Sequence, residues 1–125
     1  MNKYRNKKVV HNDIKFDSIV ERDFYLYCLK NKESMKIKDI ILKKTYTLQD
    51  KYKLDGKTVR AITYTPDVVL ITMSGKEIAI DVKGGILTEV FKLKAKMFRY
   101  KYRDVKLYIV GYRKKLGGWV DLEKK

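Results

Sequence analysis

An acidic and a basic side chain stand two positions apart near the end of one apolar stretch. Residues 78–85 read IAIDVKGG, in which apolar residues alternate with Ala79, Asp81 and Lys83. A period of two is typical of a β-strand with one face in the core. Asp81 and Lys83 therefore share a face, about 7 Å apart at roughly 3.3 Å rise per residue. They could form an exposed ion pair of little energetic value or belong to a catalytic site.

A second carboxylate is expected beside Asp81. The strand-like residues 57–71 run into the next strand through Met-Ser-Gly at 73–75. This turn is typical of a three-residue hairpin loop whose final glycine is left-handed. Counted back from the turn, Asp67 stands opposite Asp81, with Cβ atoms about 5 Å apart. The alternative is that Asp67 is a polar residue at a bulge caused by Pro66.

Adjacent carboxylates repel one another unless a cation or a proton separates them. Magnesium is typically held by one or two carboxylates, with water in the other positions. From its position, the Lys83 ammonium could orient a water or neutralise charge developing on a phosphate. The glycines at 84 and 85 would let a phosphate backbone approach closely. The pattern favours Mg²⁺, with Mn²⁺ as a substitute, and no small-molecule organic cofactor is expected.

The composition favours one domain with a polyanionic partner. The 125 residues include 30 Lys and Arg against 15 Asp and Glu, a formal net charge of +15, and 45% are hydrophobic. We expect a single domain over 1–125, with a basic arm at 1–12 and a basic tail at 113–125. The charge favours DNA as partner over anionic membranes.

The lone cysteine and the lone histidine exclude several chemistries. Cys28 and His11 cannot form a zinc cluster, and they give little support to Cys-His or Ser-His nucleophiles. No apolar run approaches the roughly 20 residues of a membrane span, and the N-terminus lacks the apolar region of a signal peptide. We therefore expect a cytoplasmic protein without membrane association.

Two helices should position the site. Ser18, with Glu21 three residues later, has capping-box spacing at the start of a helix that ends near Asn31. Glu21 could serve this cap or face the hairpin. The predicted apolar face of this helix is Phe16, Val20, Phe24, Tyr27 and Cys28. The second helix begins at Thr88, and its predicted apolar face is Val90, Leu93 and Met97, followed by Tyr100 or Lys101.

The strands complete an α/β (α+β) fold with a mixed central sheet flanked by helices. Residues 45–54 are expected to pair with 57–71 across an Asp-Gly turn at 55–56. The final strand, 105–112, follows the second helix and should run parallel to the strand of Asp81. The element order is helix, three strands, helix, strand.

The spacing of Pro66-Asp67 and Asp81-Val82-Lys83 resembles the signature of the PD-(D/E)XK nuclease superfamily. Five blocks in this order also resemble a family of small phage-encoded proteins, assigned to that superfamily and likened to Holliday-junction resolvases. These blocks are KYRNKK, IKFDSIVE, the TPD strand, DVKG and TEVFKLKAK, and the resemblance covers residues 3–112. Where that family tends to carry Gln-Pro before its first strand, this chain has Lys43-Lys44.

The resemblance implies a restriction-endonuclease-like αβββαβ core and a metal-dependent endonuclease acting on branched DNA. Asp67, Asp81 and the Val82 carbonyl would hold the ion, Glu21 would join them directly or through water, and Lys83 would position the attacking water. A homodimer in the host cytoplasm is the matching expectation. The candidate DNA-binding residues are Lys43, Lys44, Thr88, Lys92, Lys94, Lys96 and Arg99.

Two other functions remain open from the sequence. A nuclease of the same fold could act on flaps or linear duplex, because substrate geometry is read by surface shape. A non-catalytic nucleic-acid-binding module could keep the fold and the charge without cleaving. The lysines of the second helix could equally be a solvated face.

Overall fold

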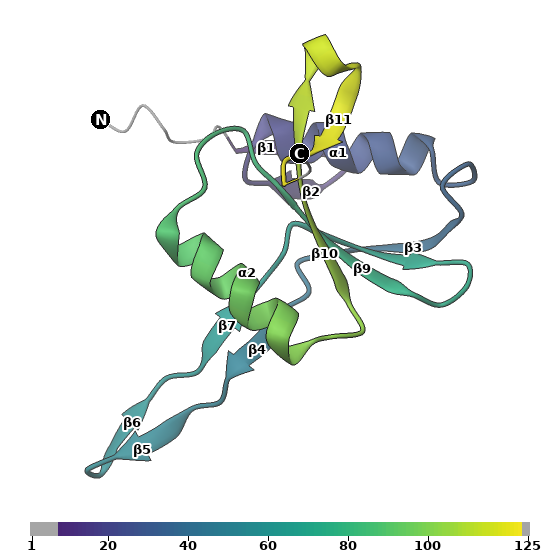
Figure 1. Ribbon diagram of the computed structural model, residues 1–125. Helices are drawn as coiled ribbons and strands as arrows, with labels where there is room; N and C mark the ends of the chain where they lie inside the picture. Colours follow the sequence, from purple (N-terminus) through teal and green to yellow (C-terminus); the bar gives the residue numbers. More distant parts are fainter. Residues whose placement is uncertain (1–7, 124–125) are drawn as a thin grey trace.

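The computed structural model describes residues 8–123, which form two helices and a set of short strands. Figure 1 shows their arrangement. In chain order the elements are β1 (Val9–His11), β2 (Ile14–Phe16), α1 (Ile19–Lys30), β3 (Ile37–Leu42), β4 (Tyr46–Gln49), β5 (Tyr52–Leu54), β6 (Lys57–Val59), β7 (Ile62–Tyr64), β8 (Val68–Thr72), β9 (Glu77–Val82), α2 (Glu89–Lys101), β10 (Lys106–Arg113), the 3₁₀ turn η1 (Lys114–Leu116) and β11 (Gly118–Asp121).

The central sheet has five strands in the order β11-β10-β9-β8-β3. β9 and β10 are parallel and joined through α2, while the other neighbours are antiparallel. The predicted α/β fold class with a mixed sheet is therefore confirmed. The parallel crossover predicted for the last strand is also present.

The two helices cover opposite faces of this sheet. The α1 side chains Phe24 and Cys28 pack with Val68, Leu70 and Ile80 in one buried cluster. The α2 side chains Phe91, Ala95 and Phe98 belong to a second buried cluster on the other face of the sheet. Its strand residues are Val69, Ala79, Leu107 and Ile109. Since β8 and β9 are buried on both faces, their apolar runs are nearly continuous.

The predicted apolar face of α2 is wrong. Val90 and Leu93 are 64% and 59% exposed, whereas Phe91, Ala95 and Phe98 are buried. Both sets recur at helical spacing, so periodicity does not separate them. The aromatic set lies against the sheet because Phe buries more apolar area per residue.

The first strand of the core is β3, and the assignment of 45–54 to that position is wrong. β3 pairs with β8 in the register Leu42↔Val68. The ribbon is then interrupted around Pro66, and β4 resumes with β7 in the register Tyr46↔Tyr64. The same register on both sides makes β4–β7 an outward continuation of the β3–β8 hairpin.

Residues 46–64 form an arm that projects from the body at the lower left of Figure 1. At its tip, β5 and β6 pair around Asp55 and Gly56, whose φ angles of 50° and 77° suit a type I′ turn. This confirms the predicted Asp-Gly hairpin. The root is fixed to the body, since Tyr46 and Tyr64 are buried beside Phe98.

Both chain ends carry more structure than the expected arm and tail. Within the predicted basic arm, β1 pairs with β2, while residues 1–7 lie outside the described part. Within the predicted tail, β11 adds the fifth strand. Arg99 fastens this end to α2 through Glu123, at 2.9 and 2.5 Å, and also donates to the Leu107 carbonyl at 2.7 Å. No helix among residues 8–123 is long and apolar enough to cross a membrane.

Candidate active site at the ends of β8 and β9

The hairpin turn places Asp67 beside Asp81. Gly75 adopts φ of 88°, and the strands pair in the register Val68↔Ile80. The next pair outward is Asp67 and Asp81, so the register predicted from the turn is confirmed. Alternation puts Asp81 on the α2 face with Ala79. Pro66 ends the preceding segment, and Asp67 lies in a bend rather than within β8.

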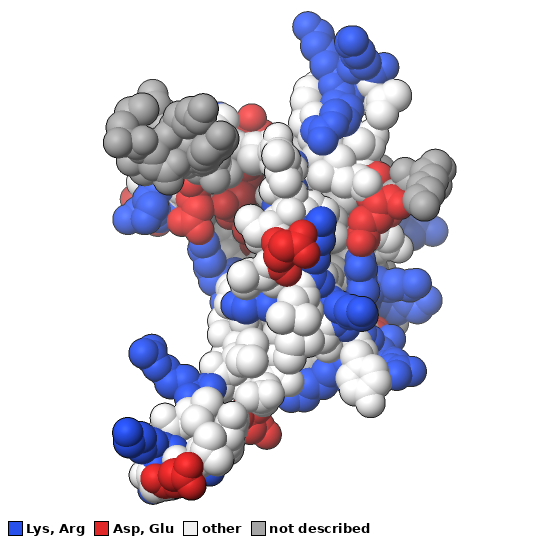
Figure 2. Space-filling view, turned by 60° about the vertical axis from the view of Figure 1, so that its left-hand side comes forward, with Lys and Arg blue, Asp and Glu red and all other residues white. Residues whose placement is uncertain are grey.

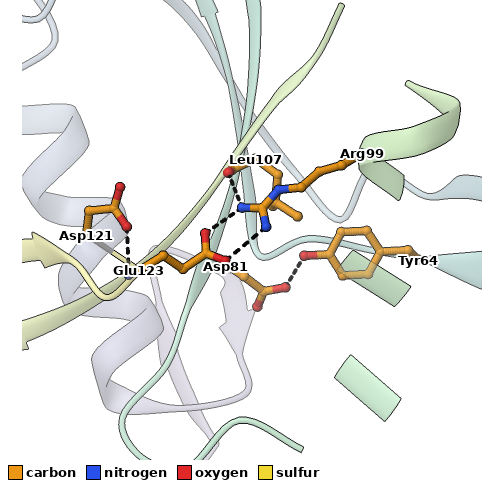
Figure 3. A network of polar contacts seen from close by, with 6 residues as sticks. All are labelled: Tyr64, Asp81, Arg99, Leu107, Asp121 and Glu123. Carbon is orange, nitrogen blue, oxygen red and sulfur yellow. Dashed lines mark hydrogen bonds and ion pairs between the residues drawn. The ribbon is translucent and has the colours of Figure 1, made fainter. Parts of the chain in front are cut away.

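Asp81 is 4% exposed and has a partner for each carboxylate oxygen. The Tyr64 hydroxyl donates a hydrogen bond to Oδ2, as Figure 3 shows. The Lys83 ammonium lies 3.5 Å from Oδ1 and 4.1 Å from the centre of the Phe91 ring. Burial and the neighbouring Asp81 charge raise the pKa of Tyr64, which keeps it a hydrogen-bond donor. Tyr64 and Lys83 thus fix the Asp81 carboxylate from two sides.

The Asp67 carboxyl is the acid of the site with the strongest upward pKa shift. Burial and then the neighbouring Asp81 raise its pKa well above the ordinary value, and Glu21 acts in the same direction. One bond opposes this: the Val82 N–H donates to Asp67 Oδ2 at 2.7 Å. The Val82 carbonyl points to the same edge of the extended strand, toward Asp67, because Lys83 N–H pairs on the other side with Val110.

Glu21 belongs to the helix cap through its backbone and to the acid site through its side chain. Its N–H donates to Ser18 Oγ at 3.2 Å, as an N-cap requires. Its carboxyl, in a residue 8% exposed, lies near enough to Asp67 for that side chain to affect its pKa. Burial raises the Glu21 pKa, and the charges of Asp17 and Asp81 add to this, against lowering effects of Asp67 and Lys43. Glu21, Asp67 and Asp81, with Lys83, are called the acid site below.

Lys43 is a counter-charge at the edge of the acid site. The ribbon register on both sides of the interruption places Lys43 opposite Asp67. Its ammonium pairs with Asp17 Oδ2 at 3.1 Å. Burial lowers the Lys43 pKa, but the bond to Asp17 and the charges of Glu21 and Asp67 outweigh it, so the net shift is upward. Lys43 therefore offsets part of the carboxylate repulsion.

The acid site fits a divalent cation in the type of its donors but not in their present arrangement. Among residues 8–123, no group of three or more His, Cys, Asp or Glu side chains could hold a metal ion as placed. Burial and the closeness of other carboxylates raise the pKa values of Asp67 and Glu21, as is expected where no cation separates them. Hard cations do take carboxylate and carbonyl oxygens, and an ionised carboxylate has about four lone-pair sites. Asp81 can therefore accept from Tyr64 and still act as a ligand.

The other predicted residues lie apart from the acid site. Lys44 pairs with Glu77 at 2.8 Å, and Lys92 pairs with Glu89 at 3.2 Å. Thr88 caps α2 by accepting from Phe91 N–H at 3.1 Å. The remaining three basic candidates lie along α2: Lys94 is half-buried, Lys96 is exposed, and Arg99 is engaged by Glu123. Of the predicted DNA-binding residues, Lys43 is close enough to feel the charges of Glu21 and Asp67, and the Arg99 charge acts on Tyr64.

Two contributors to the site were not found from the sequence. Tyr64 reaches Asp81 from the arm root, and its place depends on the bend at Pro66, which interrupts the alternation. Asp17 directly precedes the N-cap residue Ser18 and pairs with Lys43. The one available signal for Asp17 is its position next to Ser18, which fixes it near the start of α1.

The fold and the site define a class: a mixed α/β domain whose central sheet gathers three carboxylates and a lysine at one end. Residues 1–117 match the model of a family described as "Protein of unknown function (DUF1064)", and the chain belongs to that family. No curated protein and no solved structure matches the chain.

Proposed function

We propose that the protein is a metal-dependent DNA endonuclease of the PD-(D/E)XK type that acts on branched DNA such as Holliday junctions. One observation carries the proposal: Glu21, Asp67 and Asp81 are buried together at one end of the sheet, where burial first and neighbouring carboxylates second raise the pKa values of Glu21 and Asp67. Such clustering is costly for folding alone and is typical of functional sites. The blocks that resemble the phage-encoded resolvase-like family support the same activity.

The residues have distinct roles in this proposal. Asp67, Asp81 and the Val82 carbonyl would hold Mg²⁺ or Mn²⁺, with Glu21 binding directly or through water. Bound there, the cation would supply Lewis-acid stabilisation of charge on the phosphate. Lys83 would orient the attacking water and donate to a phosphate oxygen in the in-line transition state. Tyr64 would hold the Asp81 carboxylate in one orientation.

The charge of the molecule supports a nucleic-acid substrate. The net charge is +15, and Figure 2 shows Lys and Arg side chains spread from the top of the visible face to the arm at the lower left, with smaller groups of acidic side chains between them. A Holliday junction has two-fold symmetry and needs paired cuts, so the active form would be a C2 homodimer. A mass of one protein chain per junction, measured by light scattering, would contradict the dimer.

One cleavage experiment tests the activity. A labelled four-way junction, a flap and a matched duplex are incubated with the protein in Mg²⁺, in Mn²⁺ or in EDTA. Asp81→Asn is assayed alongside, since asparagine keeps the shape of the side chain and removes its charge. We expect the junction to be cut only with a divalent cation and only by the parent, while both proteins bind the junction.

Each other outcome has a definite meaning. Cutting by Asp81→Asn equal to that of the parent would overturn the site. Preferential cutting of the flap or the duplex would keep the site and change the substrate. Binding without cutting under every condition would replace the proposal with a non-catalytic nucleic-acid-binding module.

A further inference from the structure

The arm tip is the most exposed regular element of the molecule. Residues 50–58 are all exposed, including every residue of β5 and two of the three residues of β6. The root is buried against α2, and the Tyr102 hydroxyl donates to the Thr47 carbonyl at 2.8 Å. An isolated two-stranded ribbon is only marginally stable in water. A ribbon that is held at its root and exposed on both faces at its tip is therefore available for contact with a partner.

The two faces of the tip differ in chemistry. The pair Lys53↔Thr58 puts these side chains on one face of the ribbon. Two positions farther along each strand, in the same register, Lys51 and Arg60 fall on the same face. This set, Lys51, Lys53, Thr58 and Arg60, is called the cationic face. The cationic face ends at the turn residue Asp55, the one carboxylate within residues 51–60, all of them described.

The opposite face is more apolar. It carries Tyr52 and Leu54, which are 47% and 58% exposed, with Val59 and Lys57 as their partners across the ribbon. Lys and Arg side chains project from the arm at the lower left of Figure 2. Among the described residues, no ion pair engages Lys51, Lys53 or Arg60. Their charge is therefore available to a polyanion.

We propose that the arm is a duplex-DNA-binding ribbon that enters the major groove with its cationic face toward the phosphate backbone. The major groove, about 12 Å wide, admits a two-stranded β-ribbon, whereas entry into the minor groove, about 6 Å wide, requires the duplex to be widened or bent. Lys51, Lys53 and Arg60 supply phosphate contacts, and Thr58 supplies a hydroxyl that can reach either phosphate or base edges. The proposal deepens the proposed function, because it places the duplex that the acid site would cut.

The arm also sets a distance along the DNA. From Tyr64, which bonds Asp81, to the turn at Asp55 the chain extends up to about 30 Å at roughly 3.3 Å per residue. Successive base pairs are about 3.4 Å apart, so the tip reaches about 8 or 9 base pairs from the acid site. With the arm aligned along the duplex that carries the proposed cut, the groove contact would be at most about one helical turn from that cut.

The test compares two triple variants with the same loss of charge. The first is Lys51→Gln, Lys53→Gln and Arg60→Gln on the cationic face. The control is Lys30→Gln, Lys106→Gln and Lys114→Gln, three exposed lysines outside the arm. Binding to a labelled 30-base-pair duplex is measured by fluorescence anisotropy in EDTA at several salt concentrations. Circular dichroism verifies that both variants are folded.

We expect the arm variant to bind at least about tenfold more weakly than the control. Its plot of log affinity against log salt concentration should also be shallower, by the amount that corresponds to about three phosphate contacts. Methyl green, a major-groove ligand, should compete with the parent, and netropsin, a minor-groove ligand, should not. Equal weakening by both variants would overturn the arm contact. Competition by netropsin alone would overturn the groove assignment.

A second measurement addresses the apolar face. Tyr52→Ser with Leu54→Ser is examined for mass by sedimentation and for duplex affinity. A shift from dimer to monomer with unchanged duplex affinity would overturn the proposal and assign the arm to self-association. An unchanged mass, with duplex affinity lost only in the cationic-face variant, supports it.

The inference and the proposed nuclease activity fail separately. If the parent binds duplex through the arm but cuts no DNA in Mg²⁺, the proposed nuclease activity is overturned and the DNA-binding role of the arm is retained. If the parent cuts DNA and the arm variant binds duplex as tightly as its control, the DNA-binding role of the arm is overturned and the proposed nuclease activity is retained.

Discussion

Asp67 and Asp81 are held inside the protein by a backbone N–H and a tyrosine, whereas Lys51 and Lys53, farther out along the ribbon that contains Asp67, stand in solvent. At the acid site like charges are brought together, and burial raises the pKa of Asp67. On the arm like charges alternate along the strand and are screened by water. Catalysis at one phosphodiester bond requires side chains in fixed positions. Attraction of a polyanion requires only that the charged side chains extend far enough to contact it. The predictions below separate these two uses of the ribbon.

The largest effect is expected from Lys83→Met, which keeps an apolar stem over Phe91 but removes the ammonium. DNA cleavage should fall by about 100-fold or more, because a donor aimed at the developing phosphate charge is lost. Duplex affinity should change little. Lys44→Met is the matched control, since Lys44 also pairs with a carboxylate and lies over a ring, that of Tyr46. Single-turnover rates at saturating protein measure the difference, and equal losses would remove Lys83 from the chemistry.

Asp67→Asn should stabilise the cation-free protein at alkaline pH. The folded-state pKa of Asp67 lies above its unfolded value, so its contribution to folding is present below the ordinary carboxyl pKa and is lost as pH rises through the raised value. Asparagine can still accept from Val82 N–H. We expect about 1 to 3 kcal/mol of stabilisation at pH 8 and much less at pH 4.

Urea unfolding in EDTA at both pH values measures the Asp67→Asn effect. Asp104→Asn, at an exposed position, serves as the control and should show no such difference. A stabilisation of Asp67→Asn that is the same at pH 4 and pH 8 would contradict the electrostatic account. Added Mg²⁺ should stabilise the parent more than Asp67→Asn, because a ligand of the folded state shifts the equilibrium only where it binds.

Tyr64→Phe should slow cleavage by about tenfold, because the Asp81 carboxylate loses the hydrogen bond that orients it. The two root tyrosines provide a matched pair: Tyr46 faces Tyr64 in the ribbon, and its hydroxyl donates to Glu77. Tyr46→Phe removes the same group from the same ribbon without touching the acid site. Cleavage rates that respond equally to both changes would indicate a general effect on the arm root.

The smallest effect is expected from Lys94→Ala on α2. Lys94 is half-buried, and its helix lies over the α2 face of the sheet. Loss of one phosphate contact should weaken junction binding by about two- to threefold. Anisotropy at fixed salt, with Lys106→Ala as control, measures it. An unchanged affinity would make the exposed side of α2 a solvated face.

The predictable parts of the molecule are those set by local chemistry. Ser18 begins α1, Gly75 fixes the hairpin register, and the Asp-Gly turn at 55–56 closes the tip, as their residue types indicate. From Gly75 alone the neighbourhood of Asp67 and Asp81 follows by counting. The convergence of Glu21 on this pair was expected from the resemblance, since nothing local relates α1 to β8.

The missed parts depend on contacts between distant segments. Two apolar rows on α2 fit the helical period, and only packing against Val69 and Ala79 selects the row of Phe91. The sequence pattern does not reveal β3. Residues 45–54, which belong to the arm, are therefore wrongly assigned to the central sheet in its position. Tyr64 reaches Asp81 only because the chain bends at Pro66, and a bend of that kind has no period to detect.

Tyr64 has a consequence for how DNA and metal would affect one another. Its backbone belongs to the arm root and its hydroxyl to Asp81, so a displacement of the root by bound duplex changes the environment of that carboxylate. Thermodynamic linkage then requires reciprocity. Any factor by which duplex raises the affinity for a divalent cation must equal the factor by which the cation raises the affinity for duplex. One phenol group would thus make substrate and cation mutual effectors.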